Sequence, residues 1–312
     1  MAQKHLNHFS LFTNDVETTS VWFNSLRDET GLMVIKEGMP LLLDIYQEYK
    51  IQSTFFFNGD IVKLAPDVVK MILPFGHEVG SHGMSHRVED GFDLMDLRTQ
   101  IRHLSESKNL LEGISGREVI SFRAPALRTN KYTGLALVET GYKVDSSVAS
   151  TRFDAFMSFG SSKKLKWLTA PRVPYRTRRD DLTKKGEDGV IEIPLSATFF
   201  PYVGTTMRIF PRLTSLQHNL LNLETKRINN KPIVFDIHPN EFIDESEGER
   251  YIERRSKGIL SYLIKDLLRS RLKTNNLGTR AIPLYKKEIE FFLNEGYIFT
   301  TVQDYCIQNK LL

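Results

Sequence analysis

The sequence predicts an α/β protein built around a parallel sheet. Two observations lead to this prediction: short apolar stretches of strand character alternate with helical stretches through the first half of the chain, and polar residues follow most of the predicted strands. Such alternation is typical of βαβ units, in which the strands run the same way. In these sheets the functional side chains gather at the carboxyl ends of the strands.

The elements of the first half follow from local composition and periodicity. Short apolar runs bounded by polar residues predict strands over residues 8–13, 51–57, 77–82, 119–125 and 143–147. Apolar residues at helical spacing predict helices over residues 39–50, 64–76, 94–116 and 132–142. The stretch 64–76 has a proline near its first turn and ends at Gly76, as helices commonly do.

The second half of the chain is less regular. Residues 151–189 are rich in charge, serine, proline and glycine, and predict a loop-rich start to an insertion over 151–230. Strands are expected over residues 190–196, 231–239 and 297–302, and helices over 248–272 and 283–296. No repeat or linker divides the chain, so 1–312 is expected to form one domain that ends with C-terminal helices and a closing strand over 248–312.

Composition narrows the class of protein. The chain has 312 residues, 41% of them hydrophobic, which is enough for a sizeable core. The formal net charge of +4 is too small to predict a nucleic-acid partner. We see neither a transmembrane run nor an apolar signal-peptide core, and the single cysteine, Cys306, excludes an intrachain disulfide. A cytoplasmic location is the simplest expectation.

Polar residues of complementary chemistry follow the predicted strands. The stretch EVGSHGMSH places His82 and His86 four residues apart after the third strand, and Asp15 and Glu17 follow the first. The other strand ends supply Arg123, Asp145, Asp236, His238 and Glu241. Two neutral imidazoles and one carboxylate form a ligand set for a divalent metal such as zinc. A separate carboxylate can then act as a base.

Asp15 and Glu17 are separated by one residue. Side chains on a strand alternate with a period of two, so both carboxylates lie on one face and both can reach one metal. From the residues alone, either carboxylate can be the ligand and the other the base.

Four stretches, in this order along the chain, resemble successive motifs of the polysaccharide deacetylases, the NodB-homology group of carbohydrate esterases: STFFFNGD, GHEVGSHGMSH, SFRAPAL and VFDIHP. The resemblance covers most of the chain. It implies a deformed (β/α) barrel of about seven strands, with an insertion before the last motif. It also implies one divalent metal, zinc first, with cobalt, nickel and manganese as alternatives. The implied partner is an N-acetylated sugar or glycan.

The resemblance also assigns residues to the metal site. His82 and His86 match the two metal-binding histidines of the second motif. The first motif departs from the family's usual pair of adjacent aspartates, and NDVE is similar to a branch with an acid-x-acid spacing. By that analogy Asp15 is the catalytic base and Glu17 the metal ligand, although the reverse assignment stays open.

The resemblance implies further roles around the reacting group. Arg123 matches an arginine that orients the base through an ion pair. His238 matches the histidine that protonates the leaving amine, and Asp145 matches the aspartate that tunes this histidine. The usual aromatic neighbour of that aspartate is replaced here by Ser146. A backbone N–H near Ala126 is expected at the developing oxyanion.

The insertion has a counterpart in the same branch. VIEIPLSATFFPYVGTTMRIFP resembles a segment that lies near the site in that branch, which makes Tyr202 and Arg208 candidate substrate contacts. The implied reaction removes an N-acetyl group from an amino sugar: Asp15 takes a proton from the attacking water and His238 gives one to the amine. Alternatives are a deformylase, a hydrolase of small cyclic amides such as allantoin, and a catalytically silent carbohydrate-binding protein.

Overall fold

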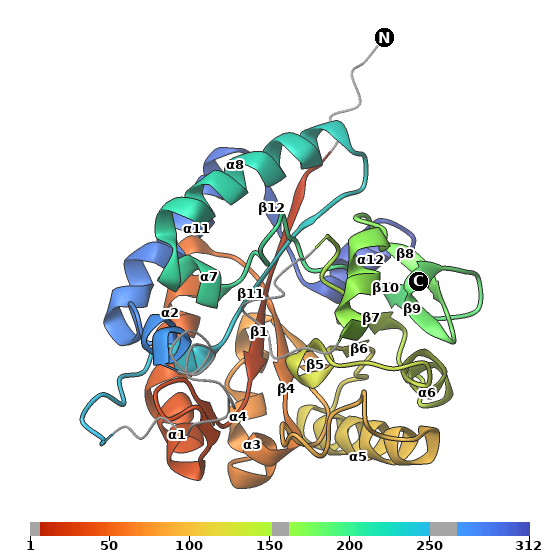
Figure 1. Ribbon diagram of the computed structural model, residues 1–312, viewed down its shortest axis with the longest axis horizontal. Helices are drawn as coiled ribbons and strands as arrows, with labels where there is room; N and C mark the ends of the chain where they lie inside the picture. The colour runs from red at the N-terminus through yellow and green to blue at the C-terminus, as the bar shows by residue number, and fades with distance from the viewer. Residues whose placement is uncertain (1–6, 152–161, 250–266) are drawn as a thin grey trace.

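The computed structural model describes residues 7–151, 162–249 and 267–312. Within these residues the main sheet has ten strands in the order β11-β1-β4-β5-β6-β7-β10-β8-β9, and β12 pairs with the start of β1 (Figure 1). Each neighbouring pair from β11 to β10 is parallel, whereas β8 and β9 add an antiparallel edge. The α/β class and the parallel sheet are therefore confirmed.

The strands of this sheet are mostly short. The longest is β1 (Phe9–Val16), which is buried along its whole length. The other parallel strands are β4 (Thr54–Phe57), β5 (Glu78–Ser81), β6 (Ser121–Phe122), β7 (Val144–Asp145), β10 (Ile191–Glu192), β11 (Ile233–Ile237) and β12 (Ile298–Phe299). The antiparallel edge is β8 (Tyr175–Arg178) and β9 (Asp181–Lys185), and a separate pair joins β2 (Thr19–Ser20) to β3 (Ser25–Leu26). Each predicted strand overlaps one of these strands, and β1 continues three residues beyond the predicted 8–13.

The parallel sheet curls into a half-barrel. The residues after β10 bring the two sides of the sheet together. The N–H of Ile193 donates to the carbonyl of Asp145 in β7 at 2.8 Å, and that of Ser196 donates to the carbonyl of Val234 in β11 at 3.0 Å. A bridge between Val203 and Asp236 continues this contact. The curled sheet of parallel strands agrees with the deformed barrel that the family resemblance implied.

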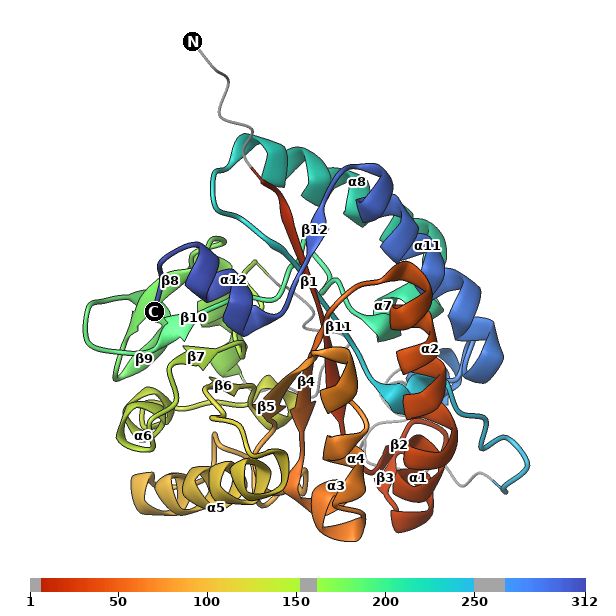
Figure 2. The same ribbon diagram turned by 180° about the vertical axis from the view of Figure 1, so that it is seen from behind.

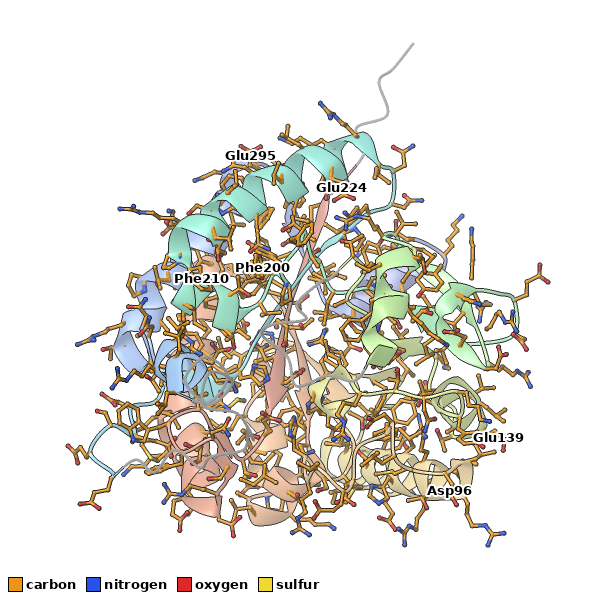
Figure 3. All side chains as sticks on the ribbon, in the orientation of Figure 1. Asp96, Glu139, Phe200, Phe210, Glu224 and Glu295 are labelled. Atoms are coloured by element: carbon orange, nitrogen blue, oxygen red, sulfur yellow. The ribbon has the colours of Figure 1, made fainter. Side chains whose placement is uncertain are left out.

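Helices cover the outside of the curled sheet (Figure 2). Four of them match predicted helices: α2 (Met39–Tyr49), α5 (Leu97–Ser115), α6 (Thr133–Glu139) and α11 (Ala281–Asn294). The longest, α5, begins after Asp96, whose carboxylate accepts the backbone N–H of Thr99 at 2.8 Å (Figure 3). No helix in the described part of the chain is long and apolar enough to cross a membrane.

Several predictions of secondary structure were wrong. The predicted 64–76 helix is broken into α3 (Gly59–Leu64), α4 (Asp67–Lys70) and the 3-10 turn η2 (Leu73–Phe75). Pro66 and Pro74 lack the N–H that a continuous helix needs. Unpredicted elements are α1 (Asp28–Met33), the π turn η1 (Val34–Gly38) and α12 (Val302–Gln308), and the remaining turns are η3 (Pro125–Leu127), η4 (Ser162–Thr169), η5 (Pro239–Glu241) and η7 (Gly278–Arg280).

The predicted insertion is more ordered than its composition indicated. It contains β8, β9 and β10, together with α7 (Gly204–Ile209) and α8 (Pro211–Arg227). A proline at the first turn of α8 is a start signal that we did not use. Most of the helix predicted over 248–272 falls on 250–266, outside the described residues; α10 (Arg269–Lys273) lies at its end.

Candidate active site

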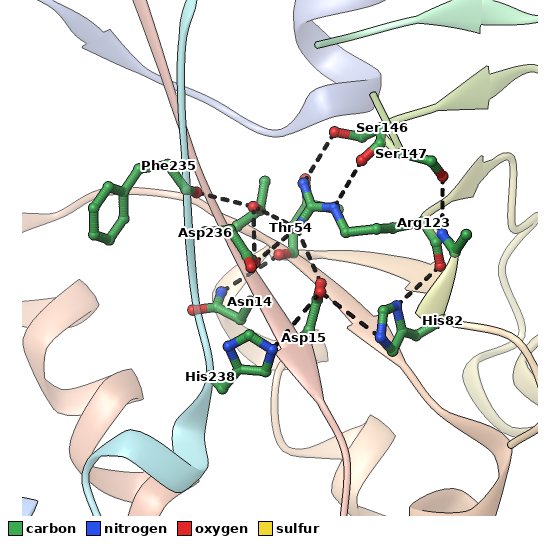
Figure 4. A network of polar contacts seen from close by, with 12 residues as sticks. Asn14, Asp15, Thr54, His82, Arg123, Ser146, Ser147, Phe235, Asp236 and His238 are labelled. Atoms are coloured by element: carbon green, nitrogen blue, oxygen red, sulfur yellow. Dashed lines mark hydrogen bonds and ion pairs between the residues drawn. The ribbon is translucent and has the colours of Figure 1, made fainter. Parts of the chain in front are cut away.

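Asp15, Arg123 and His238 meet His82 at the carboxyl ends of the parallel strands (Figure 4). On β1, Thr13 and Asp15 both face Arg123, which follows β6, with N–O distances of 2.9 and 3.0 Å. Asn14 points the other way, where its side chain accepts a hydrogen bond from Tyr46 at 2.7 Å. This alternation carries the acids of NDVE toward one centre, as the period of a strand predicts.

Glu17, His82 and His86 offer three ligand atoms that lie within 4.8 Å of one another. The Oε2 atom of Glu17 is 2.9 Å from Nε2 of His86 and 3.8 Å from Nε2 of His82. The Nδ1 atom of His82 lies 2.9 Å from the carbonyl oxygen of Arg123, which orients the ring with Nε2 toward the acids. That Nε2 atom is buried and has no hydrogen-bond partner among the described residues. An oriented imidazole with an unsatisfied buried nitrogen fits a divalent metal ligand.

Burial and charge act against each other in this group. Burial would raise the pKa of Glu17, but His86 and the other nearby imidazoles hold it well below its ordinary value. Burial lowers the pKa of His82, more than the carboxylates of Asp15 and Glu17 raise it. An ionised carboxylate and a neutral imidazole are the protonation states that metal binding requires.

Arg123 is fully buried and organises the polar network behind Asp15. Its Nη1 donates to Asp15 at 3.0 Å and to Asp236 at 2.7 Å, while its Nε donates to the carbonyl of Ser146 at 3.0 Å. The guanidinium also lies over the ring of Phe56, 4.4 Å from its centroid. The ion pair expected between Arg123 and Asp15 is present in the structure. Its two carboxylate partners compensate a charge that would be costly to bury alone.

The two carboxyl groups on Arg123 differ in acidity. Burial would raise the pKa of Asp15, but His82 and Arg123 lower it below its ordinary value. Burial and the neighbouring Asp15 raise the pKa of Asp236 to about 7, despite Arg123. Asp15 is therefore the ionised member of the pair and the better placed to accept a proton.

His238 lies across from these acids. Its Nε2 atom is 4.0 Å from Asp15 and 3.9 Å from Glu17, and its Nδ1 atom is 3.4 Å from Oε1 of Glu241. Burial would lower the pKa of His238, but Asp236, Glu241 and the other acids raise it to about 10. The ring therefore holds a proton close to Asp15 at neutral pH.

Asp145 does not make the contact predicted for it. Its carboxyl accepts a hydrogen bond from Ser147 at 2.6 Å and faces Glu192, and no hydrogen bond or ion pair among the described residues joins it to His238. The reason is register: β7 and β10 pair in parallel, with Asp145 opposite Glu192. Glu192 in turn accepts the N–H of Val148 at 3.0 Å. The two buried carboxyls form a structural pair behind Arg123.

Glu192→Gln is expected to make stability less sensitive to pH. Burial raises the pKa of both Glu192 and Asp145, and Asp145 raises that of Glu192 further. The folded protein thus holds protons that the unfolded chain releases. The pair therefore destabilises the wild type increasingly as pH rises from the ordinary carboxyl pKa to the raised pKa of the folded state. Glutamine cannot ionise. Urea unfolding from about pH 4 to 8 should show the free energy of unfolding of the variant rising relative to that of the wild type as pH rises. A difference in stability that does not change with pH would contradict the raised pKa values of Glu192 and Asp145.

Ala126 lies on the loop that follows Arg123. It is exposed, in η3, and adopts a left-handed backbone conformation with φ of 51°, followed by Leu127 with φ of 53°. Two successive non-glycine residues in this region cost free energy, and such strain clusters at functional sites. The oxyanion role of its N–H stays a prediction.

Tyr202 and Arg208 were expected to contact substrate, but both side chains are fully buried. Tyr202 packs on Phe235 with ring centroids 4.7 Å apart, and its hydroxyl donates to Glu288. Arg208 donates to Glu241. Arg208 lies in α7, which packs against β11 and α11, and Tyr202 precedes this helix, so neither side chain is exposed for a direct substrate contact.

Part of the chain matches a known protein family. Residues 28–144 match the family model described as polysaccharide deacetylase. This part of the chain is similar to the polysaccharide deacetylase family. The matched range includes His82, His86 and Arg123, while Asp15 and His238 lie outside it and are brought to the same centre by the fold.

Curated proteins similar to this chain come from bacteria and fungi. The chain is 27% identical over 149 residues to the peptidoglycan deacetylase of Helicobacter pylori, covering 46% of this chain and 50% of that protein. It is 32% identical over 104 residues to a peptidoglycan-N-acetylglucosamine deacetylase of Bacillus cereus, covering 33% and 47%. The chain thus spans about half the length of these relatives.

Solved structures show the same fold at low sequence identity. A probable polysaccharide deacetylase from Pseudomonas aeruginosa matches this chain with a TM-score of 0.60 and 13% identity, over 96% of this chain and 90% of that one. An allantoinase matches with a TM-score of 0.61 and 14% identity, over 96% and 89%. These likenesses support the fold alone.

Several residues of the site were not predicted from the sequence. Asp236 and Glu241 stood among the polar strand-end residues, yet we assigned neither a role. Glu192 was not considered, although its place in the alternating stretch VIEIPLS puts a charge where a buried strand is otherwise apolar. A charged residue inside a predicted buried strand is the signal that could have found it.

Proposed function

We propose that this protein is a metal-dependent hydrolase that removes N-acetyl groups from an amino sugar or glycan intermediate. The convergence of Glu17, His82 and His86 beside the ion-paired Asp15 is the observation that carries the proposal. The relatives named as peptidoglycan deacetylases support the acetamide as the bond that is cleaved. Zinc and a cytoplasmic location remain predictions from the sequence.

In this proposal Glu17, His82 and His86 hold the metal. A carboxylate with two imidazoles suits zinc, and also cobalt, nickel or manganese. Asp15 groups with Asp236 and His238 and is held by Arg123 at 3.0 Å, and this ion pair supports Glu17 as the ligand and Asp15 as the base. A bound divalent ion supplies Lewis-acid activation of the acetamide carbonyl and of water.

The protein's own residues carry the proton transfers. Asp15, kept ionised beside Arg123, accepts a proton from the attacking water. His238 donates the proton that the departing amine needs, since its Nε2 faces the acids. The N–H near Ala126 stabilises the developing oxyanion. Acetate and a free amino sugar are the products.

A substrate panel tests the proposal. The full chain, loaded in turn with zinc, cobalt, nickel or manganese, is assayed on N-acetylglucosamine oligomers, peptidoglycan fragments, N-formyl sugars and allantoin. Equimolar acetate and free amine from an N-acetylated sugar, lost on chelation, is the expected result. Formate release alone, or opening of allantoin alone, would replace the proposed deacetylase activity with one of the other amide reactions. Metal binding with no turnover would favour the silent carbohydrate-binding alternative.

Asp15 and Glu17 are expected to respond differently to removal of their charge. Asp15→Asn should keep the metal and lose about 10²–10⁴-fold in kcat, the usual contribution of a general base. Glu17→Gln should weaken metal binding itself, because it removes the charge of the carboxylate that groups with His82 and His86 as a ligand. Metal titration and kcat are measured on both variants. Loss of metal from Asp15→Asn with retention in Glu17→Gln would exchange the two roles.

A further inference from the structure

A buried chain of three side chains runs from α7 into the candidate site; we call it the Arg208–Glu241–His238 chain. Glu241 ends the turn η5, which directly follows His238. Its Oε1 atom accepts the backbone N–H of His238 at 3.3 Å and lies 3.4 Å from the ring nitrogen Nδ1. Its Oε2 atom accepts a hydrogen bond from Nε of Arg208. The two oxygens of one carboxylate thus link Arg208 to His238.

Arg208 and Glu241 are both inaccessible, with 0% and 1% exposure. Burial would raise the pKa of Glu241, but Arg208 and His238 lower it to about 2, so the carboxylate stays ionised. Arg208 is itself fixed, because Nη1 donates to the carbonyls of Lys273 at 2.8 Å and Asn275 at 2.9 Å. A carboxylate fixed at Nδ1 orients an imidazole and directs Nε2 to the opposite side.

Gly204, the first residue of α7, leaves the space that Glu241 occupies. A Cβ atom at this position would lie 2.5 Å from Oε1 of Glu241 and 2.7 Å from Cγ1 of Ile237. Only glycine avoids this overlap without moving the carboxylate. The start of α7 therefore controls the oxygen that faces His238.

We propose that Glu241 is a positioning residue for His238, and that Arg208 holds Glu241 in place. Glu241 thereby has the task that was expected of Asp145, which is paired with Glu192 instead. Arg208 lies in α7, which precedes β11, and its side chain is buried. Through Glu241 it would then support protonation of the leaving amine. This inference rests on the proposed function of His238 as the general acid.

Glu241→Gln tests the inference on the metal-loaded full chain, with an N-acetyl sugar and 4-nitrophenyl acetate as substrates. We expect kcat on the amide to fall about 10–100-fold, the usual loss when a supporting hydrogen bond is removed. Metal content and KM should not change. The activated ester should lose less than about threefold, because its leaving group needs little protonation.

Glu288→Gln is the matched control. Glu288 is also buried and also contacts a histidine, His218 Nδ1, at 2.9 Å, but it lies in the core beside Tyr202. This variant should keep the wild-type ratio of amide to ester activity. Equal losses on both substrates in Glu241→Gln, or no loss, would overturn the inference.

A second variant leaves all three side chains in place. Gly204→Ala should move the Glu241 carboxylate and reproduce the selective loss on the amide, whereas Gly113→Ala, with no atom within 4 Å of the new methyl group, should not. A wild-type amide-to-ester ratio in Gly204→Ala would count against the inference.

Proton NMR of the metal-free chain separates this inference from the proposed function. The hydrogen-bonded Nδ1–H of His238, assigned by its loss in His238→Ala, should disappear or shift in Glu241→Gln and persist in Glu288→Gln. Persistence in Glu241→Gln would overturn the positioning role. A wild type that shows the expected NMR pattern but releases no acetate from any sugar would overturn the proposed function while the positioning role of Glu241 stands.

Discussion

His82→Ala is expected to lose most of its bound metal, and its activity should fall to that of the metal-free protein. Three protein ligands leave little redundancy, and the buried Nε2 of His82 has no hydrogen-bond partner among the described residues that could compete with a metal. Metal content after dialysis, measured by elemental analysis, is the primary readout. Calorimetric titration with zinc gives the affinity.

His77→Ala is the control for this variant. His77 begins the same motif and is buried, but it lies at the amino end of β5, the end opposite the site. Its Nδ1 accepts the N–H of Ser53 there at 3.1 Å. Burial lowers its pKa to about 4, as expected for a neutral structural histidine. His77→Ala should lose stability and keep the metal. Stoichiometric metal in His82→Ala would remove His82 from the ligand set.

His238→Ala is expected to lose about 10²–10⁴-fold in kcat on an N-acetyl sugar, the usual contribution of general acid catalysis. Amide hydrolysis must expel an amine, which needs a proton during or before cleavage. An aryl acetate expels a stabilised phenolate, so its hydrolysis should fall much less. Both rates are measured at equal metal occupancy.

The matched control for His238 is His218→Ala. His218 is buried and paired with a carboxylate, but it stacks on Phe291 with ring centroids 3.7 Å apart and lies outside the site. Its removal should lower stability and leave the amide-to-ester ratio unchanged. Similar losses on both substrates in His238→Ala would instead indicate local misfolding at the end of β11.

The α/β class and the location of the site could be predicted from the sequence because both depend on short-range patterns. Alternating strand and helix periods predict parallel strands, and parallel strands bring their carboxyl ends to one rim. The period of two in β1 predicted that Asp15 and Glu17 share a face. The ion pair between Asp15 and Arg123 was implied by the family resemblance, and it forms because Asp15 lies near the end of β1 and Arg123 directly follows β6.

The tertiary structure alone decided which side chain each buried carboxylate contacts. Asp145 pairs with Glu192 because β7 and β10 are adjacent and in register, and that register depends on the whole curled sheet. Glu241 receives Arg208 because α7 packs against β11. These contacts join residues far apart in the chain, where no local period operates. The sequence by itself therefore determined the chemistry of the strand ends, while long-range packing determined how each catalytic side chain is held.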